Sequence, residues 1–99
     1  MAVYVDRARY ELRGELWCHM VADSIDELHA FAKSLGLRKD WFQSTSFPHY
    51  DLTVFFREKA LYLGAIEGGR RQIIACARQL KTELSLQTSA RQEQLTLFS

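Results

Sequence analysis

The sequence predicts an α/β fold: a small single domain in which a short sheet packs with about three helices, followed by a flexible C-terminal tail. Two short runs alternate in the manner of strands, and three longer segments carry apolar residues at helical spacing. The stretch after residue 84 is mostly polar. A chain of 99 residues has the size of one domain. We therefore place the domain at residues 1–84 and the tail at residues 85–99.

The predicted strands begin at the N-terminus. In residues 2–6 the valines point to one face, while Tyr4 and Asp6 point to the other. Residues 16–22 form a second apolar run that favours a strand, although its length also permits a helix. A basic, polar connection joins the two runs. A very short strand is expected at residues 65–67.

The clearest predicted element is a helix over residues 24–35. Its first residues, Ser-Ile-Asp-Glu, match a capping box in which Ser24 is the N-cap and Glu27 reaches back to it. Gly36 is well placed to end the helix. The inward stripe is Ile25, Leu28, Ala32 and Leu35.

Two more helices are expected further along the chain. Asp51 is predicted to cap a helix over residues 52–63, and a Gly-Gly turn is predicted to precede a third helix over residues 70–84. Their inward stripes are Leu52, Phe56, Ala60 and Leu63, then Ile73, Ala77, Leu80 and Leu84. Residues 37–50 should be an irregular loop that packs on the domain, because three aromatic rings need cover: Trp41, Phe42 and Phe47.

Composition limits the possible environments and partners. The formal charge is +1, so no large excess of charge steers the protein to nucleic acid or to a membrane. Cys18 and Cys76 form no metal-binding or redox motif, and we expect two buried thiols. We find no signal peptide and no apolar stretch long enough to cross a membrane, and therefore expect a cytoplasmic protein.

Four polar side chains are candidate catalytic and metal-binding residues: Asp6, His19, His49 and Asp51. Asp6 ends a predicted strand, where ligand sites in α/β folds are common. His49 and Asp51 are two apart, so in an extended segment they would share one side. Such a site could hold Mg, Mn or Zn and activate water for phosphoester hydrolysis. The simpler interpretations are that Asp51 only caps a helix and that His19 is a satisfied core residue.

A second candidate is a phosphate-binding site at Arg70 and Arg71. These residues follow Gly68 and Gly69 at the start of the third helix. Glycine amides and a helix N-terminus can cradle phosphate, with arginine adding charge. A plain turn with a solvated basic start explains the same residues.

The C-terminal peptide is a candidate partner-binding segment. Its residues Gln94, Leu95, Leu97 and Phe98 resemble the Q-L-x-L-F peptide with which bacterial DNA-processing proteins dock on the sliding clamp. A flexible peptide of this kind places a glutamine and a Leu-Phe pair in an apolar pocket. The alternative is a tail that folds back on its own domain.

Six strings span roughly the first 70 residues: MAVYVD, CHMVAD, DELHAFA, WFQ, HYDLT and LGAIE. Together they resemble a small family of bacterial and phage proteins catalogued as a domain of unknown function (domain of unknown function 4031-like). The resemblance implies a bacterial or phage origin and no particular mechanism. It also implies a second acidic residue after Asp6, where this chain has Arg7.

Three functions are consistent with these features. The first is a DNA-metabolism accessory protein that docks on the sliding clamp through its C-terminal peptide. The second is a metal-dependent phosphoesterase or nuclease that uses the His/Asp residues, with nucleic acid as one candidate substrate. The third is a phage-encoded inhibitor of a host protein, which would present Trp41, Phe42 and Phe47 to its target.

Overall fold

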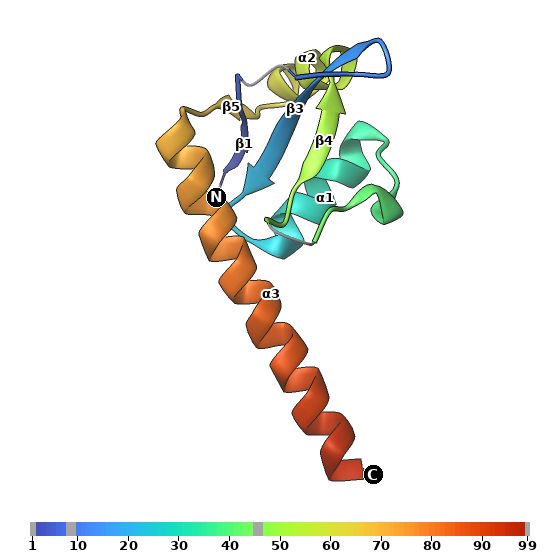
Figure 1. The fold of residues 1–99 in the computed structure, drawn as a ribbon, viewed down its shortest axis with the longest axis vertical. Helices are drawn as coiled ribbons and strands as arrows, with labels where there is room; N and C mark the ends of the chain where they lie inside the picture. Colours follow the sequence, from blue (N-terminus) through green and yellow to red (C-terminus); the bar gives the residue numbers. More distant parts are fainter. Residues whose placement is uncertain (1, 8–9, 45–46, 99) are drawn as a thin grey trace.

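The computed structural model describes residues 2–7, 10–44 and 47–98, with side chains described as far as residue 87. Its centre is a five-stranded sheet around the long strand β3 (Figure 1). One edge of β3 pairs with β2 and then β1, the other edge pairs with β4, and β5 adds to β1 in parallel. The strands are β1 (Val3–Val5), β2 (Tyr10–Leu12), β3 (Glu15–Ala22), β4 (Tyr50–Thr53) and β5 (Ile66–Glu67).

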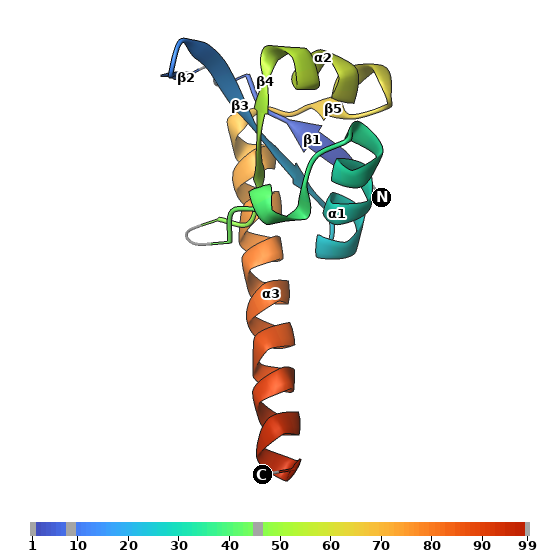
Figure 2. The same cartoon turned by 90° about the vertical axis from the view of Figure 1, so that its right-hand side faces the viewer.

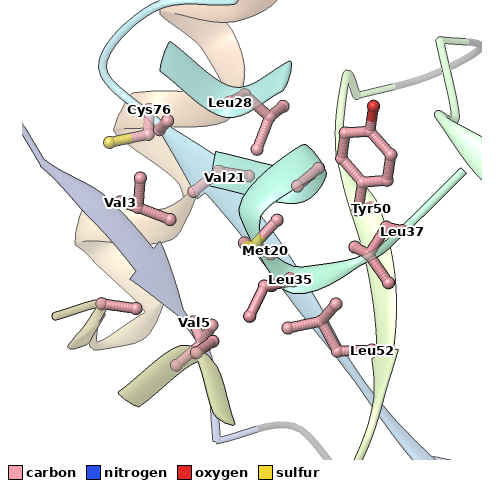
Figure 3. Packing of buried hydrophobic residues seen from close by; sticks show 14 of the residues in the cluster. Val3, Val5, Met20, Val21, Leu28, Leu35, Leu37, Tyr50, Leu52 and Cys76 are labelled. Atoms are coloured by element: carbon pink, nitrogen blue, oxygen red, sulfur yellow. The ribbon is translucent and has the colours of Figure 1, made fainter. Parts of the chain in front are cut away.

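Three helices cover the two faces of this sheet. Figure 2 shows α1 (Ile25–Leu35) and α2 (Val54–Tyr62) on one side and α3 (Arg70–Phe98) on the other. The main core lies under α1 and α2, where apolar residues of the strands point inward (Figure 3). Its fully buried members include Val5, Cys18, Met20, Leu28, Leu35, Tyr50 and Leu52. The predicted α/β class is confirmed.

Helix α1 matches its prediction, with one difference at the cap. The Glu27 N–H donates to Ser24 Oγ at 3.1 Å, and Gly36 ends the helix at φ 88°. The Glu27 carboxylate does not complete the capping box: its Oε2 is buried and has no hydrogen-bond partner among the described residues. Instead, Glu83 of α3 accepts the Ile25 N–H at 3.2 and 3.1 Å. A contact 58 residues away in sequence thus ties α3 to α1.

The predicted second helix began too early. Residues 50–53 are strand β4, and α2 begins at Val54 with the Thr53 hydroxyl accepting the Phe56 N–H at 3.5 Å. Asp51 is therefore not a helix cap. The strand forms because Leu52 pairs with Cys18 and is fully buried, which outweighs the local helical pattern. Leu63, expected to face inward, is 44% exposed.

Two predicted irregular regions contain strand pairing. Strand β2 lies in the connection after Asp6 and turns into β3 through Arg13 and Gly14, both at positive φ. The loop over residues 37–50 has a short 3₁₀ turn at Lys39–Trp41 and a bridge between Gln43 and His49. Its rings are not all covered, since Trp41 and Phe47 are each 46% exposed. Phe42 does pack, against His29 and Tyr50.

The elements after α2 follow the predicted order. The short strand at residues 65–67 is β5, and the predicted inward stripe of the third helix is confirmed, with Ala77 and Leu80 buried. The helix is longer than expected, since its backbone continues past residue 84 to Phe98 (Figure 1). Side chains from residue 88 onward lie outside the described part, so the mobility of the tail stays a prediction. Within the described residues, no helix combines the length and apolar character needed to cross a membrane.

Candidate functional site

Three of the predicted site residues lie side by side across three strands. Strand pairing places His19 of β3 opposite Asp51 of β4. On the other edge of β3, the Asp6 N–H donates to the His19 carbonyl at 3.1 Å, so Asp6 extends β1 by one residue. His49, two residues before Asp51, lies on the same side, as the extended-segment argument predicted. All four residues therefore face the side of the sheet that α3 covers.

The Asp6 carboxylate holds His19 with two hydrogen bonds. Its Oδ1 accepts the backbone N–H of His19 at 2.8 Å, and its Oδ2 lies 2.7 Å from Nδ1 of the ring. This bond raises the pKa of His19 above its ordinary value, although partial burial of the ring opposes the change. The hydrogen bond at Nδ1 fixes the orientation of the ring, and the other nitrogen, Nε2, lies 4.0 Å from Asp51 Oδ1.

His49 has the same arrangement with a different partner. Its Nδ1 lies 2.5 Å from the Phe47 carbonyl oxygen, which can only accept, so Nδ1 must carry a proton. Its Nε2 lies 3.2 Å from Asp51 Oδ1. In a neutral imidazole this nitrogen is an acceptor facing another acceptor. Either a second proton on His49 or a cation shared with Asp51 makes this contact favourable.

Asp51 lies at the centre of these contacts. Its Oδ1 also accepts a hydrogen bond from the Tyr10 hydroxyl at 2.9 Å. Partial burial, followed by this bond to Asp51, raises the pKa of Tyr10 to about 12, so the hydroxyl keeps its proton at neutral pH. Tyr10 was not predicted from the sequence, because strand β2, which carries it, was expected to be an irregular connection.

Three residues could hold a metal ion. Ligand atoms of His19, His49 and Asp51 all lie within 4.8 Å of one another, and all three side chains are partly exposed. Asp6 is not part of this group among the described residues, and both of its carboxylate oxygens contact His19, so its predicted role as a metal ligand stays a prediction. Two imidazoles and one carboxylate are a donor set that suits Zn or Mn better than Mg.

A cavity of about 350 Å³ adjoins the two histidines. Asp6, His19 and His49 line one side, and Gly68, Gly69 and Arg70 at the start of α3 line another. Of the two predicted phosphate-binding arginines, Arg70 lines this cavity, whereas Arg71 is not among its described lining residues. The other lining residues are Arg7, Val21, Phe47, Ile73, Ile74 and Ala77.

A buried arginine supports the site from behind. Arg57 of α2 is 5% exposed and donates from Nε to the Asp6 carbonyl at 3.2 Å. Its Nη2 lies 3.5 Å from Glu67 of β5, and Glu67 also pairs with Arg7. Arg57 therefore joins the ends of β1 and β5. Arg57 was not predicted as a site residue, because the expected start of this helix at residue 52 placed its inward face at other positions.

The fold and the site define a small mixed-sheet α/β protein with a His/Asp cluster beside a cavity. The chain belongs to the family described as protein of unknown function (DUF4031), whose model matches residues 3–80. This confirms the resemblance seen in the sequence. The match includes all five strands and every residue of the cluster. No curated protein and no solved structure matches the chain.

Proposed function

We propose that this protein is a metal-dependent hydrolase of phosphoesters in which His19, His49 and Asp51 hold a divalent cation. One observation carries the proposal. Each imidazole is fixed at Nδ1 by a hydrogen-bond acceptor, and each turns Nε2 toward the same Asp51 oxygen. Histidine ligands in metalloproteins have this arrangement, with the outer nitrogen bonded to a carboxylate or a backbone carbonyl.

The chain's own residues then have distinct roles. Asp6 holds the His19 ring in the tautomer that a metal ligand requires, and the Phe47 carbonyl does the same for His49. Arg70, at the cavity wall, supplies positive charge for a phosphate group. A bound divalent cation would lower the pKa of a water ligand and polarise the phosphoryl oxygen. We therefore assign hydrolysis as the reaction class. We also place the protein in the cytoplasm.

The competing account is an ion pair without a metal, in which a protonated His49 binds Asp51. Both accounts satisfy the 3.2 Å contact, but they predict different responses to metal. Calorimetric titration of the metal-free protein with Zn²⁺ and Mn²⁺ should show one site, lost in His49→Gln. The matched control is His29→Gln, because His29 lies on the other side of the sheet and contacts the Tyr50 hydroxyl at 2.8 Å.

Activity is the second measurement. With metal bound, the protein should hydrolyse a p-nitrophenyl phosphomonoester or diester, and the His49→Gln variant should not. Absence of metal binding, or equal binding by the His49→Gln variant, contradicts the metal site. Metal binding without turnover of either ester contradicts only the assignment as an enzyme.

We also propose that the C-terminal peptide docks the protein on a sliding clamp, as an accessory to DNA metabolism. The support is the sequence Gln94-Leu95-Thr96-Leu97-Phe98, which lies beyond the family match. The backbone there is helical, so binding as an extended peptide requires the last turns of α3 to unwind. The two proposals are compatible, since a hydrolase acting on nucleic acid can use such a tether.

A pull-down with purified bacterial clamp tests this second proposal. Replacing Leu97 and Phe98 by alanine should abolish binding, because an apolar pair in a pocket carries most of the affinity of a short peptide. Thr96→Ala at the variable position is the matched control and should bind normally. Equal binding by all three proteins, or by none, would remove the clamp proposal.

The inhibitor alternative has weaker support. It requires three exposed rings, and the structure exposes Trp41 and Phe47 but packs Phe42 against His29.

A further inference from the structure

The cavity beside the histidines is lined by both polar and apolar side chains. The polar ones include Asp6, His19 and His49. An apolar wall comes from β3 and from the first turns of α3, and is formed by Val21, Ile73, Ile74 and Ala77. A hydrolase that recognised only a phosphate group would not need such a wall. The arrangement instead resembles small-molecule pockets, which are mostly apolar with a few polar groups that fix orientation.

Two of the wall residues differ in how far they belong to the packed core. Ala77 is 4% exposed and belongs to the core. Ile74 is half-buried and lies outside the described core cluster, so packing of the domain does not account for it. Phe47, which is 46% exposed, lines the cavity next to the carbonyl that fixes His49. An isoleucine and an open aromatic ring are thus available to a ligand.

The charges around the cavity favour an anion. Arg7 and Arg70 both line it, and Arg7 pairs with Glu67. The one carboxylate among the lining residues, Asp6, uses both its oxygens on His19. The hydrogen bonds from His19 therefore partly offset the negative charge that Asp6 presents to the cavity. An anionic group in the cavity would meet the imidazoles and the arginine side chains, while an apolar group would meet Ile74.

We propose that the cavity binds small phosphomonoesters that carry an aromatic group, with the ring against Ile74 and Phe47 and the phosphate at the histidines. This inference rests on the proposed phosphoesterase function for the phosphate end. The volume of about 350 Å³ is at the small end of ligand pockets and accommodates one ring system with its phosphate. The aromatic group determines which esters bind.

Two non-hydrolysable probes separate the ring from the phosphate. Phenylphosphonate and methylphosphonate share the anionic group and differ in the ring. With Zn²⁺ present, phenylphosphonate should bind about ten- to hundredfold more tightly, the gain expected for burying a ring. Methyl signals of Ile73 and Ile74 should shift in the NMR spectrum with the phenyl probe. Equal affinity, or shifts elsewhere, overturns the inference.

Two bulky substitutions give a matched pair. Ile74→Trp takes up space at the apolar wall and should remove the advantage of the phenyl probe, measured as the ratio of the phenylphosphonate and methylphosphonate affinities. Ala75→Trp adds similar bulk at the neighbouring exposed position and should leave both affinities unchanged. If Ile74→Trp does not fold, Ile74→Ala should still reduce the advantage several-fold. An unchanged advantage in the Ile74 variants contradicts the placement of the ring.

Turnover distinguishes failure of this inference from failure of the proposed function. Binding of phenylphosphonate in the cavity without hydrolysis of phenyl phosphate contradicts the enzyme and leaves the binding site. Hydrolysis of phenyl and methyl phosphate with equal kcat/KM, unaffected by Ile74→Trp, contradicts the substrate class and leaves the enzyme. Hydrolysis of phenyl phosphate with the larger kcat/KM, reduced mainly in the Ile74 variants, supports both.

Discussion

The two faces of the sheet use the same strands for different purposes. On the face toward α1, β3 and β4 contribute buried apolar residues, including Met20, Tyr50 and Leu52. The face toward α3 carries His19, His49 and Asp51 beside the buried Val21. The tripeptide His49-Tyr50-Asp51 thus sends two polar side chains to the candidate site and one ring into the core. The period of two in a strand separates stability from chemistry at neighbouring positions.

The largest expected effect comes from substituting two adjacent residues on opposite faces. Leu52→Ala should reduce the free energy of unfolding by about 2–5 kcal/mol, because Leu52 is fully buried. Asp51→Asn should cost less than about 1 kcal/mol, since it loses only partly exposed hydrogen bonds. Urea unfolding measures both. Zn²⁺ titration of the folded protein should show the reverse order, with affinity kept in Leu52→Ala and lost in Asp51→Asn.

The second prediction concerns the support behind the candidate ligands. Asp6→Asn should weaken Zn²⁺ binding by about 10- to 100-fold, because a neutral amide orients and polarises the His19 ring less well than a carboxylate. The control is Asp23→Asn, since Asp23 accepts the Ala2 N–H at 2.8 Å at the other end of the same strand pair. A competition assay with a chromophoric chelator gives both affinities. Equal loss in the two variants would point to a general effect on β1.

The parts of the fold that the sequence predicted correctly are those encoded locally. Ser24, Gly36 and the stripe between them define α1 without reference to the rest of the chain. Strand β4 could not be found this way, because Leu52 fits both a helical stripe and a strand, and only pairing with Cys18 decides. Strand β2 could not be found from burial, because all three of its residues are exposed and none is needed in the core.

The candidate site shows the same division. The spacing of His49 and Asp51 correctly indicated that they share one side. The position of Asp6 behind His19 depends on the register of β1 against β3, which no local pattern gives. Tyr10 and Arg57 reach the site from elements whose type or start was predicted wrongly. The sequence therefore indicated Asp6, His19, His49 and Asp51, but not Tyr10 and Arg57, which contact Asp51 and the Asp6 carbonyl.

The third prediction compares two histidines on the two faces. The bond to Asp6 raises the pKa of His19, whereas burial lowers the pKa of His29. In metal-free protein, NMR titration of the ring protons should place His19 above the ordinary value of 6.5 and His29 below it. Similar values for both rings would show that the two faces do not differ electrostatically.

Opposite effects on stability follow from these shifts. The stability that His19 gains from its raised pKa is present below pH 6.5 and is lost as pH rises through the folded value. His29 binds a proton more readily when unfolded, so its contribution is present above pH 6.5 and is lost as pH falls through the folded value. The free energy of unfolding of His29→Gln should therefore fall less at acid pH than that of the wild type.

The smallest expected effect is at the contact that links the two layers of helices. Glu83 of α3 is the carboxylate at the N-terminus of α1, where the helix dipole favours negative charge. Glu83→Gln should lower the free energy of unfolding by about 0.5–1 kcal/mol, because the amide keeps an acceptor but loses the charge. Glu27→Gln is the comparison. Its Oε2 is buried and has no hydrogen-bond partner in the part of the chain that the structure describes, so removing the charge should be neutral or stabilising. If Glu27→Gln destabilises more, the capping box predicted from the sequence operates in solution and α3 is not the principal cap of α1.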